Sequence, residues 1–228
     1  MKYSITGIYV GNQKARPPAS PWWQPSANTI SYLPLSVDAN DAKWMGVALN
    51  WTTTNITFSD NKAVFNSSGT SCILFDTTSL PTTFTLHFIV AITTLSGYQV
   101  WFRYSDWSGY DNSRCYLYWY SQWINFSVCG SNYQSTIKVT DTNEHLYSYV
   151  IQPDWVNNTK MDFYIDGVNK NINLSKSNQS YANAKLSLWN RWYNKNEWLK
   201  GTMREVILES TYRTDAEVLA LAQQFWFA

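Results

Sequence analysis

Residues 84–92 carry the pattern that most constrains the fold. Every second position in Phe-Thr-Leu-His-Phe-Ile-Val-Ala-Ile is a large apolar residue: Phe84, Leu86, Phe88, Val90 and Ile92. Alternation over nine residues predicts a β-strand with one face in a core, because successive side chains of a strand point to opposite faces. From Asn28 onward, further short segments of this kind are separated by turn residues about every ten positions, a spacing typical of a β-sandwich. We expect strands at residues 30–35, 98–104, 114–120, 146–151, 160–165, 185–189 and 203–208.

Composition supports the same fold class. Aromatic residues make up 17% of the 228 positions and charged residues only 14%, against about 25% charged residues in a typical domain. Aromatic and β-branched residues suit pleated, half-buried strands. Single β-sandwich domains reach this length. The chain is therefore expected to be all-β.

Two local motifs predict a turn and a helix. Asp166-Gly167 follows an apolar run and is a strong signal for a two-residue hairpin turn. Near the end of the chain, Thr214 and Glu217 have the spacing of a capping box. The apolar residues after it recur at helical spacing. They are Val218, Leu221, Ala222 and Phe225.

The first 27 residues differ from the rest. Four prolines force extended backbone and remove hydrogen-bond donors, which predicts an arm rather than a core segment. The arm carries apolar anchors that include Ile8, Trp22 and Trp23. It either packs on its own domain or docks on a neighbouring subunit, and we expect docking and an oligomer. The predicted organisation is an arm at residues 1–27 and one domain at residues 28–228.

Five segments in order resemble the concanavalin A-like, laminin G-like jelly rolls. They are the opening Tyr-Leu-Pro-Leu strand from Tyr32 to Asp41, the step at 61–66, the strand 84–92, the Asp162–Val168 hairpin, and the closing 201–207 with 213–218. Ser67 stands where that family usually has Gly. The resemblance covers about residues 28–225. It implies a two-sheet antiparallel jelly-roll sandwich with one short C-terminal helix.

The resemblance leaves function open, because this fold carries lectins, glucanases, adhesion modules and virion fibres. Residues 8–14 and 23–29 also resemble the lead-in of jelly-roll proteins of tailed phages. The first interpretation is therefore a non-enzymatic virion surface protein, either a fibre, a decoration or a receptor-binding subunit, with host glycans as candidate ligands. The alternative is a secreted lectin or carbohydrate-binding module of a cell. Either one would work at a virion surface or outside the cell.

Charge argues against a nucleic-acid partner. The formal net charge is +1 and no Lys/Arg cluster is present, whereas duplex binding needs a basic stripe. The first ten residues lack the features of a signal peptide. The longest apolar stretch is far shorter than the ~20 residues of a membrane span. We expect a soluble chain.

The sequence does not predict an enzyme. The family's glucanases carry a Glu-x-Asp-x-Glu strand that this chain lacks. Glu205 and Glu209 fall on one face of a regular strand, but four residues separate them by about 13 Å, too far for paired glycosidase carboxylates. His87 is expected to face away from the core and His145 to begin a strand, and neither lies near a Ser of nucleophile-elbow type. A degraded glycosidase is the third alternative.

No cofactor or structural metal is expected either. A calcium site at the polar loop of Asp106, Asp111 and Asn112 is the one metal alternative, and a solvated loop is the favoured interpretation. Three cysteines, Cys72, Cys115 and Cys129, cannot all pair within one chain. A Cys115–Cys129 disulfide and three buried thiols both remain open.

Two aromatic clusters in expected loops are the candidate glycan-binding residues. Trp and Tyr present flat apolar faces with a polar tip and are common at recognition surfaces. The first cluster is Tyr104, Trp107 and Tyr110. The second is Trp192, Tyr193 and Trp198. The competing interpretation is that these aromatics belong to a core or a subunit interface.

Overall fold

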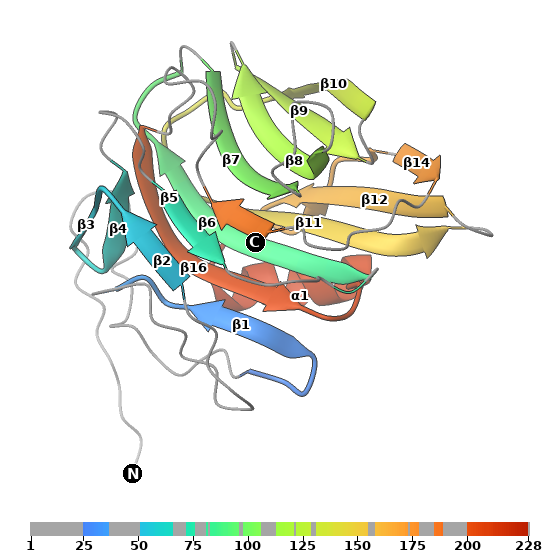
Figure 1. Ribbon diagram of the computed structural model, residues 1–228, viewed down its shortest axis with the longest axis horizontal. Coiled ribbons are helices and arrows are strands. Elements are labelled where there is room, and N and C mark those ends of the chain that lie inside the picture. Colours follow the sequence, from blue (N-terminus) through green and yellow to red (C-terminus); the bar gives the residue numbers. More distant parts are fainter. Residues whose placement is uncertain are drawn as a thin grey trace.

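The computed structural model describes residues 25–36, 51–65, 72–75, 81, 83–95, 98–105, 113–120, 122–128, 131–154, 158–172, 174–177, 185–188 and 200–227. Its strands form two antiparallel sheets (Figure 1). One has seven strands in the order β10-β9-β8-β7-β15-β5-β2. The other has nine, in the order β13-β12-β11-β6-β16-β4-β3, with β1 also paired to β16 and β14 to β12. The predicted all-β, two-sheet sandwich is confirmed.

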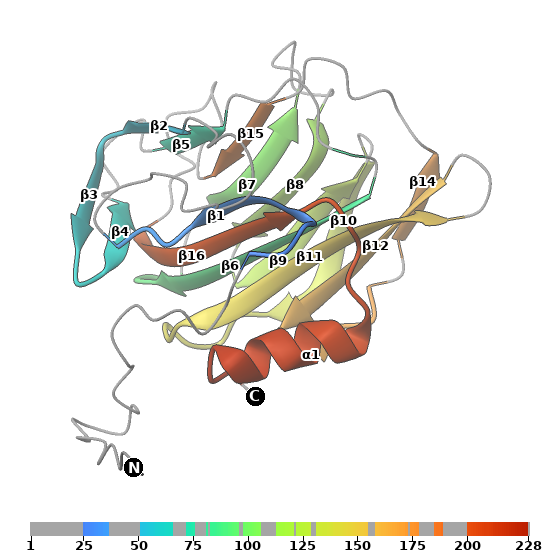
Figure 2. The same ribbon diagram turned by 90° about the horizontal axis from the view of Figure 1, so that it is seen from below.

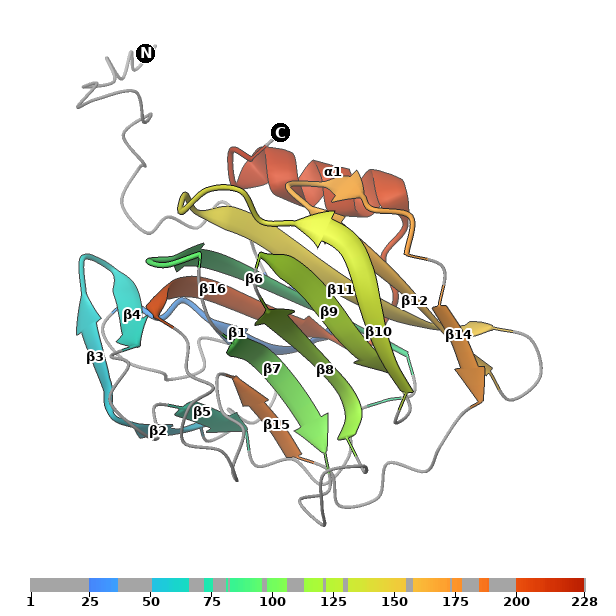
Figure 3. The ribbon, with the colours of Figure 1, turned by 90° about the horizontal axis from the view of Figure 1, so that it is seen from above.

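The strands of the seven-stranded sheet lie side by side in Figure 3. Their bounds are β2 Trp51–Thr54, β5 Cys72–Phe75, β7 Tyr98–Ser105, β8 Ser113–Tyr120, β9 Trp123–Val128, β10 Ser131–Lys138 and β15 Lys185–Leu188. The nine-stranded sheet contains β1 Thr29–Leu33, β3 Ile56–Ser59, β4 Lys62–Phe65, β6 Phe84–Ile92, β11 His145–Asp154, β12 Asn158–Ile165, β13 Val168–Asn169, β14 Leu174–Ser177 and β16 Gly201–Glu209.

The core between the sheets is aromatic. The five alternating residues of β6 all lie in it, as predicted from the sequence. Phe88 of β6 stacks on Tyr147 of β11, with ring centroids 5.8 Å apart. The ring of Trp101 crosses from β7 to within 4.5 Å of the Tyr147 ring, centroid to centroid. Aromatic pairs of this kind add about 0.5–1.5 kcal/mol beyond the area that they bury.

The single helix, α1 (Asp215–Gln224), covers the nine-stranded sheet on the side away from the seven-stranded sheet (Figure 2). Both halves of the predicted capping box between Thr214 and Glu217 are present. Leu221 and Ala222 pack on Ile89, Leu146 and Ile207, which point away from the main core. This second core explains why β6 is buried on both faces.

The hairpin predicted at Asp166-Gly167 is also confirmed. It joins β12 to β13, and both turn residues have positive φ, 52° and 80°. Gly tolerates this conformation without steric cost. The turn lies directly under α1, because a Cβ on Gly167 would come within 3.1 Å of the Cα of Leu219.

The predicted arm lies almost wholly outside the described residues. From Ser26 onward the chain is bonded into the domain: Thr29 N donates to Ser26 O, and Ser210 N donates to Asn28 O at 2.8 Å. Among the described residues, no helix is long and apolar enough to cross a membrane.

Candidate functional site

The two outer faces of the sandwich differ in what covers them. Helix α1 and Tyr32 of β1 cover the nine-stranded sheet. On the seven-stranded sheet, Ile124 and Phe126 of β9 point into the core, so Asn125 between them points outward. Arg103 of β7 lies in the same way between the core residues Phe102 and Tyr104. We define the outer face of the seven-stranded sheet by its described side chains Arg103, Trp123, Asn125, Gln134 and Lys138.

Trp123 and Lys138 form an exposed contact among the described side chains of this face. The two residues are paired across β9 and β10, and the Lys138 Nζ lies 4.3 Å from the centroid of the Trp123 ring. Lys138 is exposed and Trp123 is half-buried. At an exposed site such a cation–π contact stabilises by about 0.5–1 kcal/mol. The contact holds the indole in place and leaves part of it open to solvent.

An irregularity in β10 creates this pair. Gln134 of β10 is paired with Asn125 of β9. The next pair joins Lys138 to Trp123, so four residues of β10 pass over two residues of β9. Regular pairing would put Thr136 opposite Trp123. The two extra residues are held by Ser135, whose hydroxyl donates to Ile124 O and accepts from Ile137 N. Bulges of this kind re-aim a side chain, and here the bulge brings a cation to the indole.

Amide groups line the same region. The Asn125 side chain donates from Nδ2 to Trp123 O at 3.0 Å, and it is 4% exposed. Gln134, on the neighbouring strand, is exposed. On the other side of β9, the backbone of β8 brings three tyrosine positions into register. Tyr116, Tyr118 and Tyr120 are paired with Ser127, Asn125 and Trp123.

Of the six predicted glycan-binding residues, Tyr104 is described, and its prediction needs correction. It lies within β7, not in a loop, and is 1% exposed in the core between the sheets. A ring that contacts neighbouring core side chains on all sides cannot stack on a sugar. Trp107, Tyr110, Trp192, Tyr193 and Trp198 lie outside the described residues, as do Ile8, Trp22 and Trp23 of the arm.

His87, Ser148 and Glu209 resemble a catalytic triad in their order of contacts. The His87 Nδ1 lies 2.8 Å from the Ser148 hydroxyl, and its Nε2 lies 3.5 Å from a Glu209 carboxylate oxygen. As predicted, His87 faces away from the main core, but helix α1 and the segment before it leave the ring only 1% exposed. Burial lowers the pKa of His87 below its ordinary value. No substrate can reach a hydroxyl that is fully buried, as Ser148 is.

Glu205 and Glu209, which share one face of a regular strand, both accept hydrogen bonds from side chains of the domain. Glu205 sits at a bulge of β16 with φ 55°, and its Oε2 accepts from the Tyr32 hydroxyl at 2.6 Å. Glu209 accepts two hydrogen bonds from Arg213. Although burial opposes ionisation, the bonds from Arg213 and His87 lower the pKa of Glu209 to about 2. Both groups hold the β1–β16–α1 side of the molecule together.

The described residues contain no group of three His, Cys, Asp or Glu side chains that could hold a metal ion. The calcium alternative concerned Asp106, Asp111 and Asn112, which lie outside the described residues. The same holds for Cys129, one of the two cysteines of the disulfide alternative.

No protein-family model matches this sequence, and no curated protein matches it. Solved structures do match. A sialidase of Trypanosoma rangeli, determined with 2,3-difluorosialic acid, is 13% identical with a TM-score of 0.70. The match covers 90% of this chain and 34% of the sialidase, so the chain spans about a third of that protein.

Two further matches have other activities. Domain 4 of an extracellular arabinanase of Geobacillus stearothermophilus, determined with arabinotriose, is 17% identical with a TM-score of 0.63, over 86% of this chain and 98% of that domain. The binding domain of a botulinum neurotoxin of serotype D/C is 13% identical with a TM-score of 0.62, over 86% of this chain and 52% of that one. The fold is a concanavalin A-like β-sandwich. The fold that the sequence resemblance implied is confirmed, and identities this low show the fold alone.

Sequence reasoning missed Trp123 although a signal for it was present. In Trp-Ile-Asn-Phe-Ser, residues 123–127, the apolar core positions 124 and 126 alternate with polar ones. Trp123 falls on the polar phase, which is where an indole available for recognition would lie. The partnership with Lys138 had no such signal, since it depends on the bulge around Ser135.

Proposed function

We propose that this chain is a non-catalytic carbohydrate-binding module and that the outer face of its seven-stranded sheet is the binding surface. The observation that carries the proposal is the half-buried Trp123 ring, which is fixed by Lys138 and lies near the exposed amide of Gln134. An indole offers a flat apolar surface to the C–H face of a sugar, and an amide bonds to its hydroxyls.

The comparisons support a binding module more than a virion subunit. A whole domain of similar fold was determined with arabinotriose, and its parent enzyme is extracellular. None of the three matches described above is a virion protein. We therefore favour the alternative of a secreted, extracellular lectin or carbohydrate-binding module. The virion surface role stays a prediction from the sequence resemblance.

We propose that the domain is not catalytic because its candidate catalytic side chains are buried or hydrogen-bonded within the domain. The side chains of His87, Ser148 and Glu209 are buried. Glu205 accepts a hydrogen bond from Tyr32, and Glu209 accepts two from Arg213. Paired glycosidase carboxylates need to face one substrate about 5–9.5 Å apart. The described part of the outer face, as defined above, carries cations and amides instead.

A glycan array probed with the full chain tests this proposal, followed by calorimetry on the glycans that bind. Trp123→Ala is expected to weaken binding at least about tenfold, the range of a lost stacking contact at a recognition site. Tyr212→Ala is the matched control, because Tyr212 is 46% exposed and lies between β16 and α1, on the covered side of the sandwich.

Three outcomes would count against the proposal. The first is an array on which the folded protein binds nothing. The second is a Trp123→Ala variant, folded by near-UV circular dichroism, that binds as tightly as the unchanged chain. The third is hydrolysis of an oligosaccharide panel at a rate abolished by a single carboxylate substitution, which would overturn the non-catalytic part.

A further inference from the structure

The two sheets differ in their charged residues. The seven strands of the seven-stranded sheet contain four basic residues, Arg103, Arg114, Lys138 and Lys185, and no Asp or Glu. The strands of the nine-stranded sheet contain four basic residues, Lys62, Lys160, Lys176 and Arg204, and four acidic ones, Asp154, Asp162, Glu205 and Glu209. A chain with a net charge of only +1 thus has a cationic sheet on one side.

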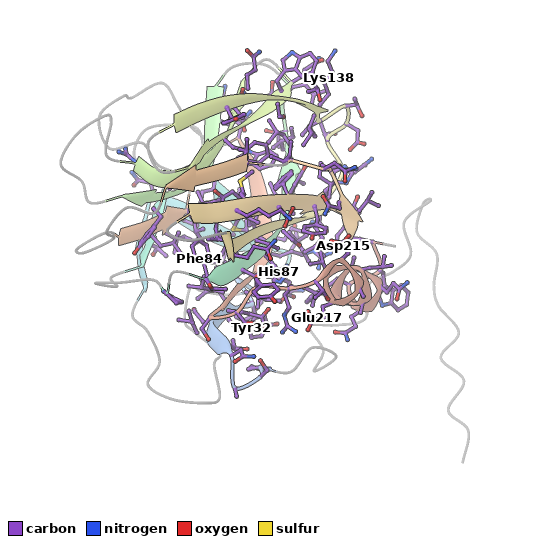
Figure 4. All side chains as sticks on the ribbon, turned by 90° about the vertical axis from the view of Figure 1, so that its right-hand side faces the viewer. Tyr32, Phe84, His87, Lys138, Asp215 and Glu217 are labelled. Carbon is purple, nitrogen blue, oxygen red and sulfur yellow. The ribbon has the colours of Figure 1, made fainter. Side chains whose placement is uncertain are left out.

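Several basic side chains of the nine-stranded sheet and the segment before α1 form ion pairs with acidic residues, whereas Lys138 forms none with a described residue. Lys62 and Arg204 both pair with Glu144, at 2.7 Å each. Arg213 pairs with Glu209. Within the described part of the chain, Lys138 makes no ion pair, and its contact is the Trp123 ring. Figure 4 shows Lys138 at the upper edge of the molecule, well apart from Asp215 and Glu217 of α1.

We infer that the glycan bound by the outer face is anionic, carrying a carboxylate or a sulfate that pairs with Lys138 while its ring lies on Trp123. This inference rests on the proposed function and adds the ligand class to it. The Lys138 ammonium lies over one face of the indole, and its N–H donors that point away from the ring can bond to an acceptor. A charged acceptor forms a shorter and stronger bond than a sugar hydroxyl. With no acid in these seven strands, a ligand anion meets no repulsion from the sheet itself.

A single-stranded nucleic acid also combines anionic groups with rings that stack. Such ligands are bound in positive grooves that follow the backbone over several nucleotides. Here the four basic residues are spread over four strands, β7, β8, β10 and β15. The glycan is therefore the ligand that we propose, and an oligonucleotide becomes one arm of the test.

The experiment compares glycans that differ only in charge. The carboxylated arm uses sialyllactose and oligogalacturonate, each against its methyl ester. The sulfated arm uses a sulfated oligosaccharide against its desulfated form, and a single-stranded oligonucleotide completes the set. We expect the acidic member of at least one pair to bind about tenfold more tightly, the worth of one hydrogen bond to a charged group. This preference should shrink as salt is raised.

Lys138→Gln should remove most of the difference in affinity between the acidic and the neutral member of a pair. Lys170→Gln, on the covered side beside β13, is the charge-matched control and should leave that difference unchanged. Equal affinity for acidic and neutral members overturns the inference while the proposed function stands. A preference that survives Lys138→Gln, or tighter binding of the oligonucleotide, also overturns it. If no member of any pair binds, it is the proposed function that fails.

Discussion

The Cβ of Ala222 in helix α1 lies where a methyl group on Gly167 would have to go: a Cβ built on the glycine comes within 2.9 Å of it. Contacts that short are essentially never seen between real Cβ atoms. The hairpin turn between β12 and β13 therefore approaches the helix more closely than any other residue type would permit.

Gly167→Ala should destabilise the domain for two reasons. The left-handed φ of 80° costs a residue with a Cβ about 1–2 kcal/mol, and overpacking against α1 adds about 1–3 kcal/mol. In a domain of this size the sum lowers the melting temperature by about 5–15 °C. Val168→Ala, at a neighbouring position that is 55% exposed, should change it by less than about 2 °C. Equal melting temperatures for the two variants would contradict the close approach.

Arg213→Ala should be more damaging than its partial exposure suggests. It removes two hydrogen bonds from Glu209, whose side chain is 1% exposed. Breaking a buried pair costs about 3–5 kcal/mol because the remaining charge loses its main partner. We expect the lower end of this range in urea unfolding, since water reaches Arg213. Adding Glu209→Gln should recover part of the loss. A double variant less stable than Arg213→Ala alone would argue against an uncompensated charge as the cause.

His145 should make stability fall as the pH rises. Its Nδ1 lies 2.6 Å from Asp166 and its Nε2 lies 3.0 Å from Asp141, and the hydrogen bond that His145 donates to Asp166 is the main reason that the pKa of His145 is raised. The folded state then binds the proton more tightly than the unfolded chain. This stabilisation is fully present below about pH 6.5, the unfolded value, and is lost as pH rises through the folded pKa.

The measurement is urea unfolding of the unchanged chain and of His145→Gln between about pH 5 and about pH 9. The stability difference between them should be largest at the acid end and shrink toward the alkaline end. His87 has a lowered pKa and so acts with the opposite sign, but it is present in both proteins and cancels in the difference. A difference that grows with pH would rule out the charged His145.

The sequence also predicts that the arm docks on another subunit through Trp22 and Trp23. Removing residues 1–24 keeps the Ser26–Thr29 turn and the bonds from Ser210 to Asn28. The truncated chain should therefore melt within a few degrees of the full chain, and sedimentation should show a smaller assembly. A full-length chain that sediments as a monomer at high concentration would remove the docking role. Failure of the truncated chain to fold would instead assign the arm to the core.

Patterns confined to one element could be predicted from the sequence. The alternation in β6, the Asp166-Gly167 turn and the Thr214 capping box each depend on neighbouring residues alone, and all three are found. No strand is expected from the sequence at the positions of β2, β3, β4, β5, β9, β10, β13 and β14. Most of these strands have four residues or fewer, which leaves an alternating pattern few positions in which to repeat.

Features set by pairing between strands could not be predicted. Strict alternation puts Glu205 on the face of Met203, yet the bulge sends Met203 into the core and Glu205 to Tyr32. A second bulge at Trp101 lets two consecutive residues, Trp101 and Phe102, enter the core. Tyr104, later in the same strand, also enters the core. In each case the deciding information is the register of a partner strand.

The covered face determines how this domain can be attached to anything else. Near the end of the chain, Phe227 packs beside Ile207 and Leu221 on the helix side. Near its start, the segment from Pro25 leads into β1, and Tyr32 of that strand packs in the same cluster. A tag or surface joined after Phe227 therefore leaves from the helix side, away from Lys138. Copies fixed to a bead or a carrier in this way would keep their Trp123 surfaces accessible, so weak single-site affinities would combine into avidity.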